Sequence, residues 1–152
     1  MTKILIIEDN PYKREKIKKV LSGITNNTSQ IIEAHSFTSG WNAVNESSYD
    51  LICLDMSLPT FDQDGQNSGG ESRVFGGKEI ARKMKRRKIQ SKFVVMTQYK
   101  RLSDEKSSET FDEIRNELLE NYPVQCLEVL FYSNKHRDWA EKLESIIKDK
   151  IL

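Results

Sequence analysis

The chain has few cysteines, little net charge and no long apolar run, and each shortage excludes a class of protein. Its two cysteines, Cys53 and Cys126, are too few for a disulfide framework or a cysteine zinc site. Both fall in strand-like stretches, where a thiol is usually a small core side chain, so we expect a reducing compartment. The 24 basic and 23 acidic residues nearly cancel, which leaves no global field that indicates nucleic acid or a membrane. The apolar runs are too short to span a bilayer and Met1 leads straight into a strand-like stretch, so we expect a cytoplasmic protein.

The length predicts one domain. A chain of 152 residues is long enough for a real hydrophobic core, and we expect a single domain over residues 1–152. Hydrophobic residues make up 37% and charged residues 31% of the chain, which is typical of a fold with a well-solvated surface.

Three acidic residues at the ends of two apolar stretches are the most informative feature. Glu8 and Asp9 close the stretch KILIIEDN, and Asp55 closes YDLICLDMSLP. Short apolar runs of this kind are typical of buried parallel strands. If the two strands are neighbours, three carboxylates meet at one edge of a sheet, where they raise one another's pKa values. A hard divalent cation such as Mg2+ resolves that repulsion, so the pattern predicts a metal-assisted phosphate site.

Strand and helix signals alternate along the chain. Asn10 offers a helix N-cap, and Pro11 suits the first helical turn. Apolar residues at helical spacing predict helices around residues 11–24, 41–44, 77–88, 111–119 and 139–147. The predicted strands are residues 3–8, 31–34, a stretch ending at 55, 93–97 and 126–132.

Five β–α units of this kind predict an α/β fold. With right-handed crossovers they form a flavodoxin-like, doubly wound, five-stranded parallel sheet with helices on both faces. The strand order 2-1-3-4-5 places the first and third strands side by side at the switch point, which brings Glu8, Asp9 and Asp55 together.

Four pieces of sequence, in order, resemble the receiver domain of two-component response regulators (CheY-like) over essentially the whole chain. They are KILIIEDN, LICLDMSLP, VVMTQ and LFYSNK. The resemblance implies that Asp55 accepts a phosphoryl group from a histidine kinase or phosphotransfer protein. It implies that Glu8, Asp9, Asp55 and the backbone carbonyl of Ser57 hold Mg2+.

The same resemblance gives roles to three residues near the ends of the last two strands. Thr97 and Lys135 would bind the phosphoryl oxygens. A hydroxyl at Thr97 can move toward such an oxygen, and Lys135 adds a compact positive charge. The ring of Tyr132 could then rotate into the space behind Thr97, which makes the pair a switch.

The sequence departs from the receiver pattern at several points. Lys135 precedes His136, where proline is usual, and Gln98 stands where a small residue is usual. A polar, Gly-rich insertion at about residues 60–76 predicts a flexible loop, which is more simply a tolerated surface insertion than a lid. The segment at about residues 98–123 is also longer than usual.

The charged runs have ordinary explanations. Six of the seven residues from Arg82 to Lys88 are basic and lie at the end of a predicted helix, where cations complement the helix dipole. We expect no nucleic-acid site there, because the run lacks interleaved aromatics.

We therefore expect a stand-alone signalling phosphoacceptor rather than an enzyme, with at most self-phosphorylation and self-dephosphorylation. No length remains for an output domain, so a separate effector protein is the expected target. Two alternatives stay open: a phosphorylation-independent, receiver-like adaptor, and an Asp-nucleophile phosphatase. The phosphatase is disfavoured, because such enzymes resemble one another in a second Asp two positions on, where this chain has Ser57.

Overall fold

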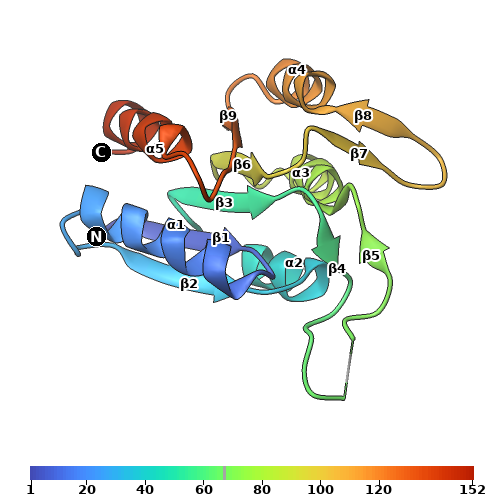
Figure 1. The fold of residues 1–152 in the computed structure, drawn as a ribbon. Helices are drawn as coiled ribbons and strands as arrows, with labels where there is room; N and C mark the ends of the chain where they lie inside the picture. The colour runs from blue at the N-terminus through green and yellow to red at the C-terminus, as the bar shows by residue number, and fades with distance from the viewer. Residues whose placement is uncertain (67) are drawn as a thin grey trace.

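The computed structural model describes residues 1–66 and 68–152 and has a central sheet of five parallel strands (Figure 1). In spatial order the strands are β2 (Gln30–Ala34), β1 (Lys3–Ile7), β3 (Leu51–Asp55), β6 (Phe93–Thr97) and β9 (Cys126–Phe131). Each neighbouring pair is parallel. Counted along the chain, this is the order 2-1-3-4-5, so the flavodoxin-like fold predicted from the sequence is confirmed.

Five helices cover the two faces of the sheet. They are α1 (Pro11–Ile24), α2 (Phe37–Glu46), α3 (Gly76–Arg86), α4 (Phe111–Asn121) and α5 (Asp138–Lys150). One face packs against α1 and α5, and the opposite face packs against α2, α3 and α4 (Figure 1). Because both faces are covered, β3 and β6 are buried along their whole length.

The turn between β1 and α1 follows from local chemistry. The Asn10 side chain caps α1 by accepting hydrogen bonds from the backbone N–H groups of Tyr12 (2.9 Å) and Lys13 (3.1 Å). Pro11, which lacks an N–H group, begins the helix. This tight turn leaves Glu8 and Asp9 at the carboxyl end of β1, one residue before the cap.

Two small antiparallel sheets lie in the segments that the sequence marks as insertions. In the first, β4 (Leu58–Pro59) pairs with β5 (Ser72–Arg73), and the Phe61 N–H donates to the Gly69 carbonyl (2.8 Å). The chain between them projects from the body as an arm (Figure 1). In the second, β7 (Arg101–Ser103) pairs with β8 (Ser108–Thr110) directly before α4. The sequence analysis predicted neither pair of strands.

None of the helices in the described ranges combines the length and the apolar character that a membrane span requires.

Candidate functional site

The three acidic residues predicted from the sequence meet at the carboxyl edge of the sheet. Strands β1 and β3 are neighbours, so Glu8 and Asp9 follow one strand where Asp55 ends the next. One carboxylate oxygen from each of the three lies within 4.8 Å of the others. Glu8 and Asp55 are buried and Asp9 is half-buried. The convergence expected from the strand order is therefore present.

An open cavity of about 270 Å³ lies beside this cluster. Asp9, Asp55 and Ser57 line one part of it, and Gln98 and Tyr99 line another. Residues from the insertion complete the wall: Pro59, Gln63, Gly70 and Ser72. A ligand that reaches Asp55 through this cavity therefore passes side chains of both the insertion and the loop after β6.

Burial and mutual repulsion raise the pKa values of the clustered carboxyls. Burial, reinforced by the charge of Asp55, raises the pKa of Glu8 to about 7. Burial also raises the pKa of Asp55, and burial together with the charge of Glu8 raises that of Asp9. Groups that resist ionisation in this way gain most from an added cation. Three carboxylates beside an open cavity are a donor set that fits Mg2+, so the residues present are compatible with the predicted metal.

Lys13 is a residue of this site that the sequence analysis missed. Its side chain is 2% exposed, and its Nζ lies 2.8 Å from Glu8 Oε1 and 3.3 Å from Asp55 Oδ1. Its charge lowers the pKa values of both Glu8 and Asp55, although burial outweighs that effect. The signal in the sequence was the spacing of residues 13, 17 and 21, which all lie on the buried face of α1.

Thr97 and Tyr132 lie behind the cluster. Thr97 ends β6 and is fully buried, and its hydroxyl oxygen accepts a hydrogen bond from the Tyr99 N–H (3.3 Å). Tyr132 is also buried, its N–H donates to the Thr97 carbonyl (2.8 Å), and its ring packs against Trp139 with centroids 4.9 Å apart. The two residues of the predicted switch are thus in backbone contact.

Lys135 lies at the surface, whereas Glu8 and Asp55 are buried. It is exposed, and its backbone N–H donates to the Ser133 hydroxyl (3.1 Å). Among the ion pairs of residues 1–66 and 68–152, Asp55 pairs with Lys13 and not with Lys135. Gln98 turns inward, and its Oε1 accepts a hydrogen bond from Lys13 Nζ (2.9 Å).

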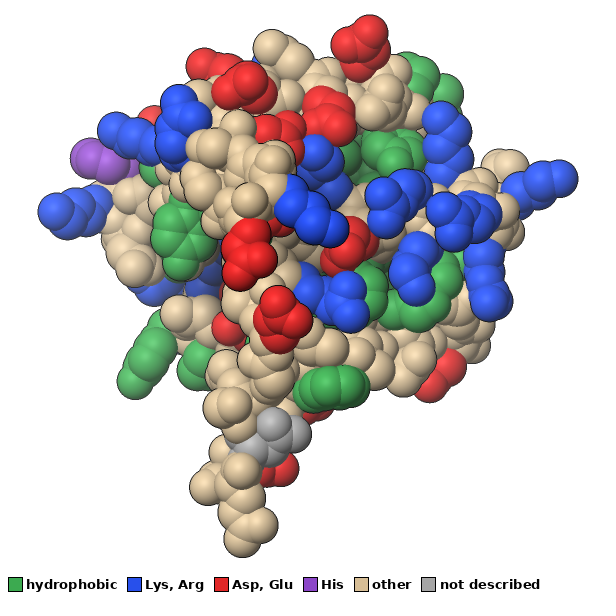
Figure 2. Space-filling model, turned by 90° about the vertical axis from the view of Figure 1, so that its right-hand side faces the viewer, with side chains coloured by type: hydrophobic (Ala, Val, Ile, Leu, Met, Phe, Trp, Pro, Cys, Tyr) green, Lys and Arg blue, Asp and Glu red, His purple; other side chains and the backbone are tan. Residues whose placement is uncertain are grey.

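The basic run at the end of α3 is backed by aromatic side chains that the sequence did not place beside it. The Lys83 ammonium lies over the rings of Trp41 (5.3 Å) and Phe37 (5.7 Å), and the Arg87 guanidinium lies over Trp41 (5.9 Å). Lys and Arg side chains gather on this side of the molecule (Figure 2). The faces of these rings are covered by Lys83 and Arg87, which agrees with a solvated end of α3.

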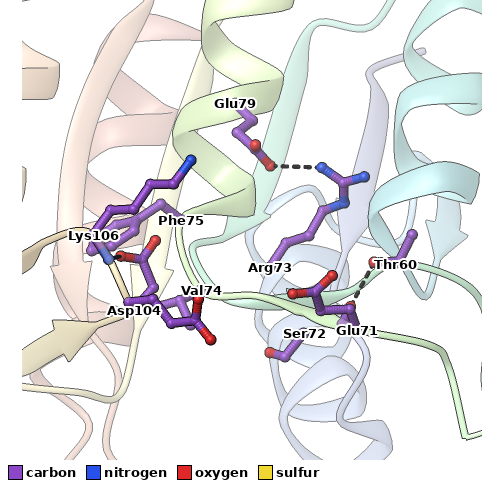
Figure 3. Close-up of a pocket in the computed structure, with 10 residues that line it drawn as sticks. Thr60, Glu71, Ser72, Arg73, Val74, Phe75, Glu79, Asp104 and Lys106 are labelled. Carbon is purple, nitrogen blue, oxygen red and sulfur yellow. Dashed lines mark hydrogen bonds and ion pairs between the residues drawn. The ribbon is translucent and has the colours of Figure 1, made fainter.

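A second cavity, of about 420 Å³, lies between the base of the insertion and the loop of the β7–β8 hairpin (Figure 3). Its wall carries charges of both signs, and Arg73 pairs with Glu79 across it (3.3 Å). Ser72 lines both this cavity and the one beside Asp55. Its acidic side chains share the wall with Arg73 and Lys106, and we assign this cavity no ligand.

Comparison with known proteins identifies the family. The model of the response regulator receiver domain matches residues 4–112. The chain is 31% identical over 123 residues to the Detocs response regulatory protein DtcB of Enterobacter cloacae (strain JD6301), covering 80% of this chain and 81% of that protein. It follows that this chain belongs to the response regulator receiver family.

Solved structures agree on the fold. A receiver domain protein from Clostridium thermocellum superposes with a TM-score of 0.65 at 19% identity, covering 99% of this chain and 94% of that one. The response regulator TrrA of Thermotoga maritima, solved with Mg2+ and BeF, gives a TM-score of 0.56 at 19% identity and covers 96% and 99%. TrrA was also solved in complex with the histidine kinase ThkA, with a TM-score of 0.55 at 20% identity and coverage of 97% and 99%. A receiver domain is a signalling domain, as expected from the sequence.

Proposed function

We propose that this protein accepts a phosphoryl group on Asp55 from a histidine kinase or a phosphotransfer protein, and then binds a separate effector protein differently. The observation that carries the proposal is the convergence of Glu8, Asp9 and Asp55 within 4.8 Å beside an open cavity. Family membership supports the same chemistry, and TrrA, a structural neighbour, was solved both with Mg2+ and BeF and with its kinase.

Asp55 is the nucleophile in this proposal. One of its carboxylate oxygens forms a bond to phosphorus as the bond between phosphorus and the donor's imidazole nitrogen breaks. The electron pair of the broken bond stays on the imidazole, which takes up a proton. The Met56 N–H donates to Asp55 Oδ1 (2.8 Å), which fixes the orientation of the carboxylate before the reaction.

Glu8, Asp9, Asp55 and the backbone carbonyl of Ser57 would hold Mg2+. When bound, the metal supplies positive charge for the transferring phosphoryl group. Three of the four proposed ligands, Asp9, Asp55 and Ser57, line the open cavity, whereas Glu8 is buried beside Lys13.

Thr97 and Tyr132 are the proposed switch residues. A hydroxyl that leaves the Tyr99 N–H for a phosphoryl oxygen would release the backbone just after β6. The Tyr132 ring, which packs against Trp139 of α5, would follow that movement and change the surface near α5 and β9. Membership of the receiver family also supports a cytoplasmic location, where histidine kinases present their phosphoryl groups.

Labelling by a small phosphodonor tests the proposal. Wild-type protein incubated with acetyl phosphate and Mg2+ should gain one phosphoryl group by intact-mass measurement, and Asp55→Asn should gain none. Asp50→Asn is the matched control, because Asp50 is an exposed aspartate at the opposite end of the same strand. Equal labelling of the Asp55→Asn variant, or no labelling of the wild type, would contradict the assignment.

The phosphorylation-independent adaptor is the weaker reading. An adaptor that has lost phosphotransfer does not require three carboxylates to stay together in a buried position, where their repulsion opposes folding. Measurable Mg2+ binding by the wild type, weakened in an Asp9→Asn variant, separates the two readings.

A further inference from the structure

Lys13 is a buried cation on the core-facing side of α1. Ile17 and Leu21 follow it at intervals of four residues and lie in the core cluster between α1, α5 and the sheet. An ammonium in this position loses its hydration, which opposes folding unless acceptors replace the water. The position of the Lys13 ammonium therefore depends on the acceptors that surround it.

Four acceptors surround its ammonium group. Besides Glu8 Oε1 (2.8 Å) and Asp55 Oδ1 (3.3 Å), these are the Met96 carbonyl (3.0 Å) and Gln98 Oε1 (2.9 Å). An ammonium has three protons, so these four acceptors exceed what it can serve at once. The contact with Asp55 is the longest of the four, which leaves that acceptor the easiest to exchange.

Lys13 also touches the elements that follow β6 and β9. Its Nζ lies 5.3 Å from the centre of the Tyr132 ring, within the range of a cation–π contact. Through Gln98 it is bound to the residue directly after Thr97. One side chain thus contacts the proposed phosphoacceptor, the loop after β6 and the proposed switch ring.

There is room for a metal beside it. The open cavity is lined by Asp9, Asp55 and Ser57, whereas Lys13 approaches Asp55 from the buried side together with Glu8. The ammonium and a divalent cation can therefore contact Asp55 at the same time.

We propose that Lys13 is a second cation, in addition to Lys135, that contacts the phosphoryl group on Asp55 and passes the change to Gln98 and Tyr132. This inference rests on the proposed phosphorylation of Asp55. When the Asp55 carboxylate becomes an acyl phosphate, a phosphoryl oxygen replaces Asp55 Oδ1 as the acceptor for the Lys13 ammonium. The shift of the ammonium changes its contacts with Gln98 and with the Tyr132 ring.

Beryllofluoride binding in the presence of Mg2+ tests the inference. The dissociation constant can be followed by tryptophan fluorescence, because Trp139 packs against Tyr132. Lys13→Met keeps the length of the side chain and removes its charge, and we expect about 10- to 100-fold weaker binding, the loss of one charged hydrogen bond. Lys19→Met should bind within about twofold of the wild type, on the same scale. Lys19 is the matched control because it is an exposed lysine of the same helix.

A second measurement on the wild type covers the case in which Lys13→Met does not fold. In nitrogen-detected NMR of the lysine ammonium groups, the buried, slowly exchanging Lys13 signal should shift when beryllofluoride binds.

The outcomes separate this inference from the proposed function. If the wild type does not bind beryllofluoride with Mg2+, the proposed function fails and this inference fails with it. If the wild type binds and Lys13→Met binds equally well, only the role of Lys13 is refuted. A Lys13 signal that does not shift when beryllofluoride binds also refutes it.

Discussion

Replacing Gly77 by alanine should loosen the contact between α3 and β3, the strand that ends on Asp55. Gly77 lies in the first turn of α3, and its N–H donates to the Met56 carbonyl (2.8 Å). A methyl group added there would lie 2.7 Å from the Asp55 carbonyl oxygen and 3.0 Å from the Met56 Cα. Both neighbours are backbone atoms, so the helix or the end of β3 has to move.

The size of the effect follows from two opposing terms. Alanine is better than glycine in a helix by at most about 1 kcal/mol. Forcing a methyl group into a closely packed backbone contact costs about 1 to 3 kcal/mol. We therefore expect Gly77→Ala to lower the free energy of unfolding by about 1 to 2 kcal/mol, measured as a lower urea midpoint at an unchanged slope.

Gly23→Ala is the control for this prediction. Gly23 lies in the last turn of α1, and a methyl group added there meets nothing within 4 Å. We expect that variant to be as stable as the wild type or more stable by up to about 1 kcal/mol. The reasoning is wrong if Gly77→Ala is as stable as Gly23→Ala. Because the moved backbone carries Asp55, Gly77→Ala should also weaken beryllofluoride binding while Gly23→Ala does not.

Three further predictions concern charge and the insertion. Without divalent cations, the free energy of unfolding should fall by roughly 3 kcal/mol as the pH rises from about 4.5 to about 7. The sign follows because burial raises the pKa of Glu8 in the folded state, so the folded state holds this proton more tightly than the unfolded chain does. A Glu8→Gln variant whose free energy of unfolding falls by the same amount over this pH range would refute this. Lys78→Met should lower stability by about 1 kcal/mol in low salt and less in 1 M NaCl, since it leaves Glu109 and Glu117, now 2.8 and 2.6 Å from the ammonium, without their shared cation. Deleting residues 62–72 should change the dephosphorylation rate without unfolding the domain, because Gln63 and Gly70 line the cavity beside Asp55; an unchanged rate would remove the lid role.

The fold was predictable in large part because three strands of the central sheet, β1, β3 and β6, are short apolar runs that end on or directly before a polar residue. The capped turn at Asn10 and Pro11 was also predictable, because both residues act through local backbone geometry. Strand order then placed Glu8 and Asp55 together without any knowledge of side-chain contacts. The sequence alone was therefore enough to predict the features of the fold that depend on hydrophobic periodicity and on local backbone chemistry.

The β7–β8 hairpin was missed because its strands are short and mostly polar. Its turn does carry a signal: Asp104 Oδ1 accepts hydrogen bonds from the N–H groups of Lys106 and Ser107, both at 2.8 Å. An aspartate that binds backbone two and three residues on favours a turn. That signal is common in loops, so it predicts a hairpin only when the flanking strands are also recognised.

The two lysines show where sequence reasoning ends. Lys135 follows a strand at the expected place, but position along the chain does not determine the direction of a long side chain, and the structure leaves it exposed. Lys13 looked like one cation among many in a basic helix. Its spacing from Ile17 indicates that it faces inward. A charged residue within the apolar stripe of a helix should therefore be considered as a buried residue.

The charge balance of the cluster explains why a buried lysine and a metal site are compatible. Three ionised carboxylates and the ammonium of Lys13 leave two negative charges, which equals the charge of one divalent cation. The pKa of Glu8 stays raised to about 7 even with Lys13 only 2.8 Å away, so the lysine compensates the cluster only in part. Protons can supply the remainder in the absence of metal, and a divalent cation supplies it more completely because all three carboxylates can then ionise. Lys13 therefore compensates part of the charge of the cluster and leaves a charge that one divalent cation balances, as the proposed phosphoryl transfer to Asp55 requires.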